Sequence, residues 1–168
     1  MKNNLRDLYL QQLQNLLSAE TQALDFLRGA SMKATDQDLK EVLSAHLSET
    51  KCQIEKLEEL LKSHPSVDAH GGECHATKGL LANARLALSE KGDPMVLDAQ
   101  LIIAARGIES YEISAYTSAI LMAEALNESD EAKELRTILK EEEGAAKKLN
   151  RISEGGFFSK GLVERIVK

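Results

Sequence analysis

Apolar residues recur every three or four positions along most of the chain, which is the period of an amphipathic α-helix. Leu, Ala, Glu and Lys are common, whereas aromatic residues make up only 4% of the chain. This composition favours helices over strands. The pattern separates into four long segments and then one short segment, at residues 5–28, 36–63, 95–126, 129–152 and 74–90. The sequence therefore predicts an all-α fold.

The expected helix boundaries are marked by residues that start or end helices. Gly29 is expected to end the first helix, and Thr35 to cap the second. Asp93 and Pro94 suit the N-cap and first position of the third long helix. Residues 64–94 form a long connection, which can carry the chain back to the other end of a bundle. We therefore expect one domain, residues 1–168, arranged as an up-down four-helix bundle with a crossover that carries the short helix.

Acidic residues interrupt the apolar stripe of every long helix at about mid-length. Burying a lone carboxylate costs several kcal/mol unless it is paired, protonated or bound to a metal ion. Glu142 fits the period of the last helix best, and Glu143 is the next choice in the run of three acids. The candidate inward-facing residues are Glu20, His46, Glu49, Glu109, Glu112, Glu142 and Glu143.

Inward Glu residues from four helices are the ligand arrangement of carboxylate-bridged di-iron and di-manganese proteins. Mixed carboxylate and imidazole ligands suit iron or manganese better than the sulfur-rich sites of structural zinc. The alternative is a buried network in which protonated acids are hydrogen-bonded to Gln53, Thr50 and tyrosines. His46 is either a ligand or a donor that orients a neighbouring carboxylate. Tyr116, one turn after Glu112, is a packing residue, a hydrogen-bond partner of the site or a redox-active group.

A second, weaker metal-site hypothesis concerns the crossover. Cys and His residues occur on and near it, but their spacing does not match the usual zinc-binding patterns. The residues concerned are Cys52, His64, His70, Cys74 and His75.

Composition and charge argue against nucleic-acid-binding, membrane-spanning and disulfide-rich secreted proteins. The chain has 168 residues, of which 43% are hydrophobic and 29% charged, and its formal net charge is −6. A negative charge argues against a nucleic-acid partner, which would require a basic face. No apolar run reaches the ~18–20 residues of a membrane span, and the N-terminus lacks the apolar core of a signal peptide. Two cysteines are too few for a disulfide framework, so we expect a cytoplasmic protein with no membrane partner.

Several blocks of the sequence resemble the YciE/YciF family, a group of small ferritin-like bacterial proteins linked by name to stress response. The most specific block is the run Glu109-Ser-Tyr111-Glu112-Ile113-Ser-Ala-Tyr116. The similarity covers nearly the whole chain in the same order. The other matching blocks are residues 17–22 (LSAETQ), 46–57 (HLSETKCQIEKL), 74–81 and 139–149 (LKEEEGAAKKL).

This resemblance implies a ferritin-like four-helix bundle with a short extra helix, and a homodimer. It also implies a rubrerythrin-like site for two Fe or Mn ions at the inward-facing residues named above. The sequence departs from the usual ferritin-like pattern of Glu-x-x-His on two helices, because Cys52 and Ala145 stand three residues after Glu49 and Glu142. The departures predict a site that is weaker than usual, dominated by carboxylates or incompletely metallated.

Two functional hypotheses follow. The first is a redox metalloprotein whose two Fe or Mn ions react with O₂ or peroxide during a bacterial stress response. The second is a non-enzymatic, stress-associated bundle with a degenerate metal site that acts through partner binding. Bulk iron storage is a weaker third option, since the sequence gives no sign of the interfaces of a large cage. No catalytic residue is assigned, and no organic cofactor is expected.

Overall fold

The structure is a computed structural model that describes residues 4–89, 91–156 and 159–167. It confirms that the chain is all-helical apart from one very short antiparallel strand pair. In chain order the elements are α1 (Leu5–Lys33), α2 (Gln37–Lys62), α3 (His75–Ser89), α4 (Pro94–Ala125), α5 (Ser129–Glu154), β1 (Gly155–Gly156), β2 (Ser159–Lys160) and α6 (Leu162–Ile166). Phe157 and Phe158 lie outside the described residues.

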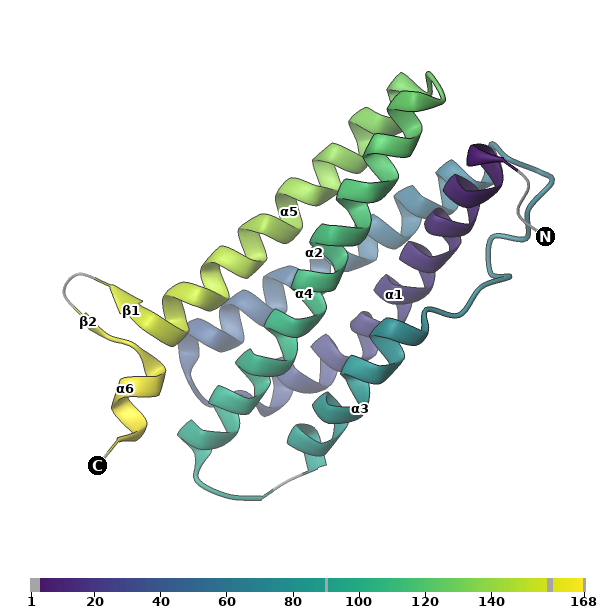
Figure 1. The fold of residues 1–168 in the computed structure, drawn as a ribbon. Helices are drawn as coiled ribbons and strands as arrows, with labels where there is room; N and C mark the ends of the chain where they lie inside the picture. The colour runs from purple at the N-terminus through teal and green to yellow at the C-terminus, as the bar shows by residue number, and fades with distance from the viewer. Residues whose placement is uncertain (1–3, 90, 157–158, 168) are drawn as a thin grey trace.

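The four long helices pack side by side (Figure 1). α1 contacts α2 and α4, and α5 contacts the same two helices, so the four helices enclose a common interior. Short turns join α1 to α2 and α4 to α5, which makes each of these pairs antiparallel. The long connection between α2 and α4 returns along the outside of the bundle, where α3 packs against α1 and α4. No helix in the described part of the chain is long and apolar enough to cross a membrane.

Aspartates set the starts of two of these helices. Asp93 caps α4 as expected, because its Oδ1 accepts a hydrogen bond from the Met95 N–H at 3.0 Å. The cap of α2 is Asp36 rather than the expected Thr35, and its Oδ1 accepts from the Leu39 N–H at 3.1 Å. Thr35 instead donates through its hydroxyl to the buried carboxylate of Asp98, at 2.7 Å. The turn before α2 is thereby tied to the start of α4.

The first helix does not end at Gly29 as the sequence suggested. α1 continues through this glycine to Lys33. A Cβ atom at position 29 would lie 3.1 Å from Cδ1 of Leu88, so glycine here allows α3 to approach α1 closely. Gly29 is therefore a packing position inside the helix, although glycine costs ~1 kcal/mol relative to alanine there.

The apolar core is divided into two halves by a polar layer. One half is built around Leu27, Leu39, Leu101 and Leu149, toward the end of the bundle where α5 terminates. The other half includes Leu13, Leu57, Tyr116, Ala119 and Leu135, toward the opposite end. On each long helix the residues between these two sets include the buried acids or the histidine of the predicted stripe. The polar groups thus lie in the middle of the bundle with apolar packing on both sides.

The C-terminal segment closes one end of the bundle. Leu162 of α6 is fully buried in the core half that contains Leu27. Arg165 donates to the Asp36 carboxylate at 2.6 Å. Gly161 passes so close to the backbone of Ser153 that a Cβ atom would collide with it. These contacts attach the end of the chain to the start of α2.

Candidate metal centre

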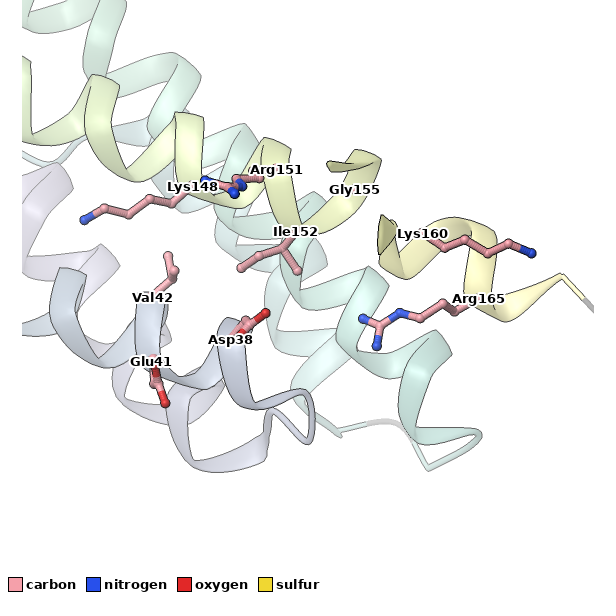
Figure 2. A pocket seen from close by; sticks show the side chains of 9 residues that line it. All are labelled: Asp38, Glu41, Val42, Lys148, Arg151, Ile152, Gly155, Lys160 and Arg165. Atoms are coloured by element: carbon pink, nitrogen blue, oxygen red, sulfur yellow. The ribbon is translucent and has the colours of Figure 1, made fainter. Parts of the chain in front are cut away.

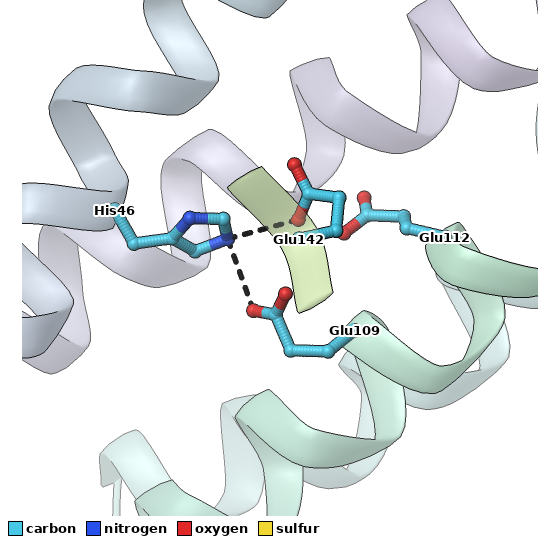
Figure 3. A group of neighbouring side chains, drawn as sticks. All are labelled: His46, Glu109, Glu112 and Glu142. Carbon is cyan, nitrogen blue, oxygen red and sulfur yellow. Dashed lines mark ion pairs between the residues drawn. The ribbon is translucent and has the colours of Figure 1, made fainter. Parts of the chain in front are cut away.

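Four side chains from three helices converge in the polar layer (Figure 3). His46 comes from α2, Glu109 and Glu112 from one face of α4, and Glu142 from α5. One ligand atom from each of the four lies within 4.8 Å of all the others. In the described part of the chain, this is the only group of three or more His, Cys, Asp or Glu residues with such geometry. The spacing is short enough for the four residues to share one ion or a pair of ions.

The His46 imidazole reaches the carboxylates through one ring nitrogen. Its Nε2 lies 3.0 Å from Oε1 of Glu109 and 3.4 Å from Oε2 of Glu142. Its Nδ1 faces the other way and lies 3.4 Å from Oε2 of Glu49. A metal-binding histidine is usually held in this manner, with one nitrogen toward the ion and the other toward a carboxylate.

Glu20 approaches the same layer from α1. Its side chain is fully buried, and its Oε1 accepts a hydrogen bond of 2.6 Å from the hydroxyl of Tyr116. The tyrosine is itself fully buried. Tyr116 therefore fixes one oxygen of Glu20, while the other oxygen receives no hydrogen bond.

The structure does not place all the sequence-predicted candidates together. Glu20, His46, Glu109, Glu112 and Glu142 are buried, as the apolar stripes predicted. Glu49 lies on the far side of the imidazole from the other acids, and its side chain is 33% exposed. Glu143 is exposed and lines a groove between α4 and α5. Of the two acids left open on the last helix, it is Glu142 that joins the cluster.

The cluster is unusual because most of its carboxylate oxygens have no hydrogen-bond donor. Both oxygens of Glu112 and of Glu142, and one each of Glu20 and Glu109, are buried and unpartnered. More than nine in ten buried polar groups in proteins are hydrogen-bonded. Four carboxylates here face a single imidazole, so the cluster lacks positive charge. Divalent ions bound by oxygen and imidazole ligands would supply it, and the residues therefore fit a metal centre.

Burial and mutual repulsion change the protonation of these groups. Burial raises the pKa of Glu112 well above its usual range, and the charges of Glu20 and Glu142 add to this. Burial likewise raises the pKa of Glu142 and lifts that of Glu20 to about 7. For His46, burial opposes protonation, but hydrogen bonds with Glu109 and Glu49 outweigh it and raise the pKa well above its ordinary value. Protons and metal ions would therefore compete for the same oxygens.

Two polar contacts beside the cluster were not evident from the sequence. The buried Cys74 thiol donates to the Tyr111 hydroxyl at 2.9 Å, next to Glu112 on α4. The amide of Gln53 donates to Oε2 of Glu141 at 3.0 Å, joining α2 to α5. Both contacts depend on how separate helices pack, and only Gln53 gave a signal, as a polar residue in an apolar stripe.

The zinc hypothesis for the crossover is not supported by the positions of its residues. Cys52, His70 and His75 are exposed. His64 is bound to Glu131, with Nε2 and Oε1 2.9 Å apart, and Cys74 is paired with Tyr111. These five side chains form no common site among the described residues.

Comparisons with known proteins agree with this architecture. The family model described as "Domain of unknown function (DUF892)" matches residues 4–160. Protein YciF of Escherichia coli (strain K12) is 31% identical over 145 residues, which is 86% of this chain and 87% of YciF. The crystal structure of the E. coli stress protein YciF matches with a TM-score of 0.83 and 30% identity, over 89% of this chain and 94% of that one. YcfI from Rhodopseudomonas palustris matches with a TM-score of 0.82 and 36% identity, over 88% and 94% of the two chains.

Proposed function

Since the chain belongs to the DUF892 family and has the helical fold of YciF, we propose that it is a ferritin-like, carboxylate-bridged di-metal protein. It holds two Fe or Mn ions and reacts with O₂ or peroxide in a bacterial stress response. The observation that carries this proposal is the buried cluster of His46, Glu109, Glu112 and Glu142 with its unpartnered oxygens. The link to stress comes from the E. coli relative, which is described as a stress protein.

The residues that would hold the ions follow from which atoms face the cluster. His46 offers Nε2, and Glu109, Glu112 and Glu142 offer carboxylate oxygens. Glu20 contributes its free oxygen from α1. When bound, Fe or Mn ions supply the electrons that reduce O₂ or peroxide. Each of the four long helices contributes at least one ligand in this arrangement.

The chain's own groups prepare the site in three ways. Glu49 lies 3.4 Å from Nδ1 of His46 and would accept the Nδ1–H when Nε2 binds a metal ion. Tyr116 donates to Oε1 of Glu20 and so keeps the other oxygen available. The apolar halves of the core on both sides exclude water, which strengthens every charge interaction between them.

A homodimer is part of this proposal. Leu121 on α4 is 62% exposed and lies in an apolar groove between α4 and α5, which a second subunit could cover. Sedimentation at several protein concentrations would measure the oligomeric state.

The second candidate function is a non-enzymatic bundle that acts through partner binding. The raised pKa of Glu112 and Glu142 favours it, because protonated acids can remain buried without a metal ion. This alternative predicts that Glu112→Leu raises stability and leaves function intact.

The test of the proposed function is the reaction of the metal-loaded protein. The protein is loaded with Fe(II) under anaerobic conditions, mixed with peroxide and followed by its ultraviolet–visible spectrum. The proposal predicts rapid oxidation of the bound iron in the wild type and loss of binding in Glu112→Ala. The exposed Glu143→Ala is the matched control and should behave as the wild type. Iron that remains unbound in the wild type, or is bound equally by Glu112→Ala, would count against the proposal.

A further inference from the structure

One side chain that contacts the cluster, that of Glu49, is partly exposed to solvent. The cluster carboxylates of Glu109, Glu112 and Glu142 are at most 1% exposed. Glu49 is the exception among the candidate residues that contact the cluster, because it touches His46 at 3.4 Å and is one-third exposed. Gln53, one turn after Glu49 on α2, contacts Glu141 of α5, which places Glu49 on the side of α2 that faces α5. Lys148 of α5 lies close enough for its charge to act on Glu49. Glu49 is therefore a partly exposed carboxylate that lies beside His46 and faces α5.

The line of contact between α2 and α5, which we call the α2–α5 seam, carries further polar side chains after Glu49 in the sequence of α2. Gln53 and Lys56 of α2 both contact Glu141 of α5, at 3.0 and 3.7 Å. The buried oxygens of Gln53 (Oε1) and Thr50 (Oγ1) have no hydrogen-bond partner. A hydrated or partly hydrated ion passes a polar seam at lower cost than an apolar one.

Two of the other long seams, α1–α4 and α4–α5, differ from the α2–α5 seam. α3 covers the seam between α1 and α4, and its Leu80 packs 3.6 Å from the Cβ position of Gly107 (Figure 1). The outer groove between α4 and α5 has charged side chains such as Lys140 and Glu143, but Ile120, Leu121 and Leu139 also line it. An ion that crossed there would have to pass these apolar side chains.

Lys148 connects the seam to a surface cavity. A cavity of about 460 Å³ lies between α2, α5 and the C-terminal segment, with Val42 and Ile152 facing each other across it (Figure 2). Val42 is one turn before His46 on α2. The Lys148 side chain points away from Gly155 (Figure 2). It forms no ion pair with any described residue, so its charge remains available to act on ions in the seam.

We propose that metal ions reach the centre through the α2–α5 seam, where Glu49 is their first ligand and Lys148 slows their passage. The inference rests on the proposed function, because it presupposes an ion that enters. An incoming divalent cation must bind Glu49 against the electrostatic repulsion of the Lys148 ammonium before it reaches His46 and Glu142. Lys148 acts on the rate of loading, Glu49 acts on the rate and also orients His46, and the buried residues determine how much metal is held.

The test measures the rate of metal uptake rather than activity. Metal-free protein is mixed with Co²⁺ in a stopped-flow instrument, and binding is followed by quenching of tyrosine fluorescence and by visible absorption. Lys148→Gln removes the charge from the seam. Lys140→Gln is the matched control, because Lys140 is an exposed lysine of the same helix that lines the α4–α5 groove instead. Glu49→Gln and Glu143→Gln form a second matched pair with the opposite charge.

Lys148→Gln should accelerate uptake about tenfold at low ionic strength, as expected for a divalent ion that passes ~6 Å from a unit charge in water. The ratio of the Lys148→Gln uptake rate to the wild-type rate should fall to about 1 in ~1 M salt, because salt screens the charge of Lys148. Glu49→Gln should slow uptake, while Lys140→Gln and Glu143→Gln should match the wild type. Final occupancy should be the same in both lysine variants, and circular dichroism checks that they fold.

The outcomes separate this inference from the proposed function. Normal Co²⁺ occupancy with an unchanged rate in Lys148→Gln, or with equal acceleration in Lys140→Gln, overturns the seam as the entrance and leaves the metal centre in place. Absence of Co²⁺ binding in the wild type overturns both the metal centre and the entrance.

Discussion

Replacing Glu20 by glutamine removes a buried charge while keeping the shape of the side chain. The amide oxygen of the new side chain can still accept the hydrogen bond from Tyr116, which the wild type makes at 2.6 Å. The pKa of Glu20 is raised by burial from its ordinary 4.5 to about 7. A difference of this size corresponds to about 3 kcal/mol of stability lost when the group ionises, at about 1.36 kcal/mol per pH unit. In the metal-free protein, Glu20→Gln should therefore be stabilising at pH 8.

The sign of the pH dependence follows from proton binding. Between the unfolded pKa of 4.5 and the folded pKa of about 7, the folded state binds more protons than the unfolded state. The free energy of unfolding of the wild type should therefore fall as the pH rises through this range, and remain reduced above it. Glu20→Gln should show a flatter profile. The two proteins should be about equally stable near pH 4.5 and differ by about 3 kcal/mol at pH 8, or ~6–12 °C in Tm.

Urea unfolding in the presence of a chelator, at pH 5 and at pH 8, measures this difference. Added Mn²⁺ should reverse it, since an ion that binds only the folded state stabilises the wild type more than a variant that has lost a ligand. A metal-free Glu20→Gln protein that is less stable than the wild type at pH 8 would show that the buried charge of Glu20 does not destabilise the fold. An Mn²⁺ effect of equal size in both proteins would remove Glu20 from the metal centre.

Two further predictions concern the support of the site and the end of the chain. Tyr116→Phe leaves Oε1 of the buried Glu20 without its donor, so the metal-free protein should lose ~1–3 kcal/mol by urea unfolding, and Mn²⁺ affinity should fall. Unchanged stability in Tyr116→Phe would show that this hydrogen bond does not hold Glu20. Leu162→Ala empties a fully buried position between the C-terminal segment and the core, and should cost ~2–5 kcal/mol in thermal unfolding. Val163→Ala, at the neighbouring exposed residue, should change stability by less than ~0.5 kcal/mol.

The helical period was enough to predict most of the buried acids. Glu20, Glu109, Glu112 and Glu142 each replace an apolar residue in a stripe, and all four side chains are buried. The burial of Glu49 was harder to predict, because a residue three positions after His46 lies near it on the helix surface but is rotated around the helix axis. On α2 this rotation turns Glu49 toward α5, where solvent reaches it.

Other features depend on contacts between distant segments and could not be predicted from local patterns. Gly29 resembled a helix stop, yet its role is to admit Leu88 of α3. Thr35 resembled a helix cap, yet its hydroxyl is taken by Asp98, 63 residues away. Asp98 accepts three hydrogen bonds from the turn before α2, and nothing in its neighbouring sequence marks it as buried. Such pairings are fixed by the packing of whole helices.

We propose that the polar layer holds two metal ions. Elemental analysis of the protein, after anaerobic reconstitution with Fe(II) or Mn(II) and removal of free metal, measures how many ions are bound. Two ions per chain are expected in the wild type and in Glu143→Ala, with a clear loss in Glu112→Ala. A wild-type protein without stoichiometric metal, or a Glu112→Ala variant that retains the full amount, would show that the polar layer is not a di-metal centre.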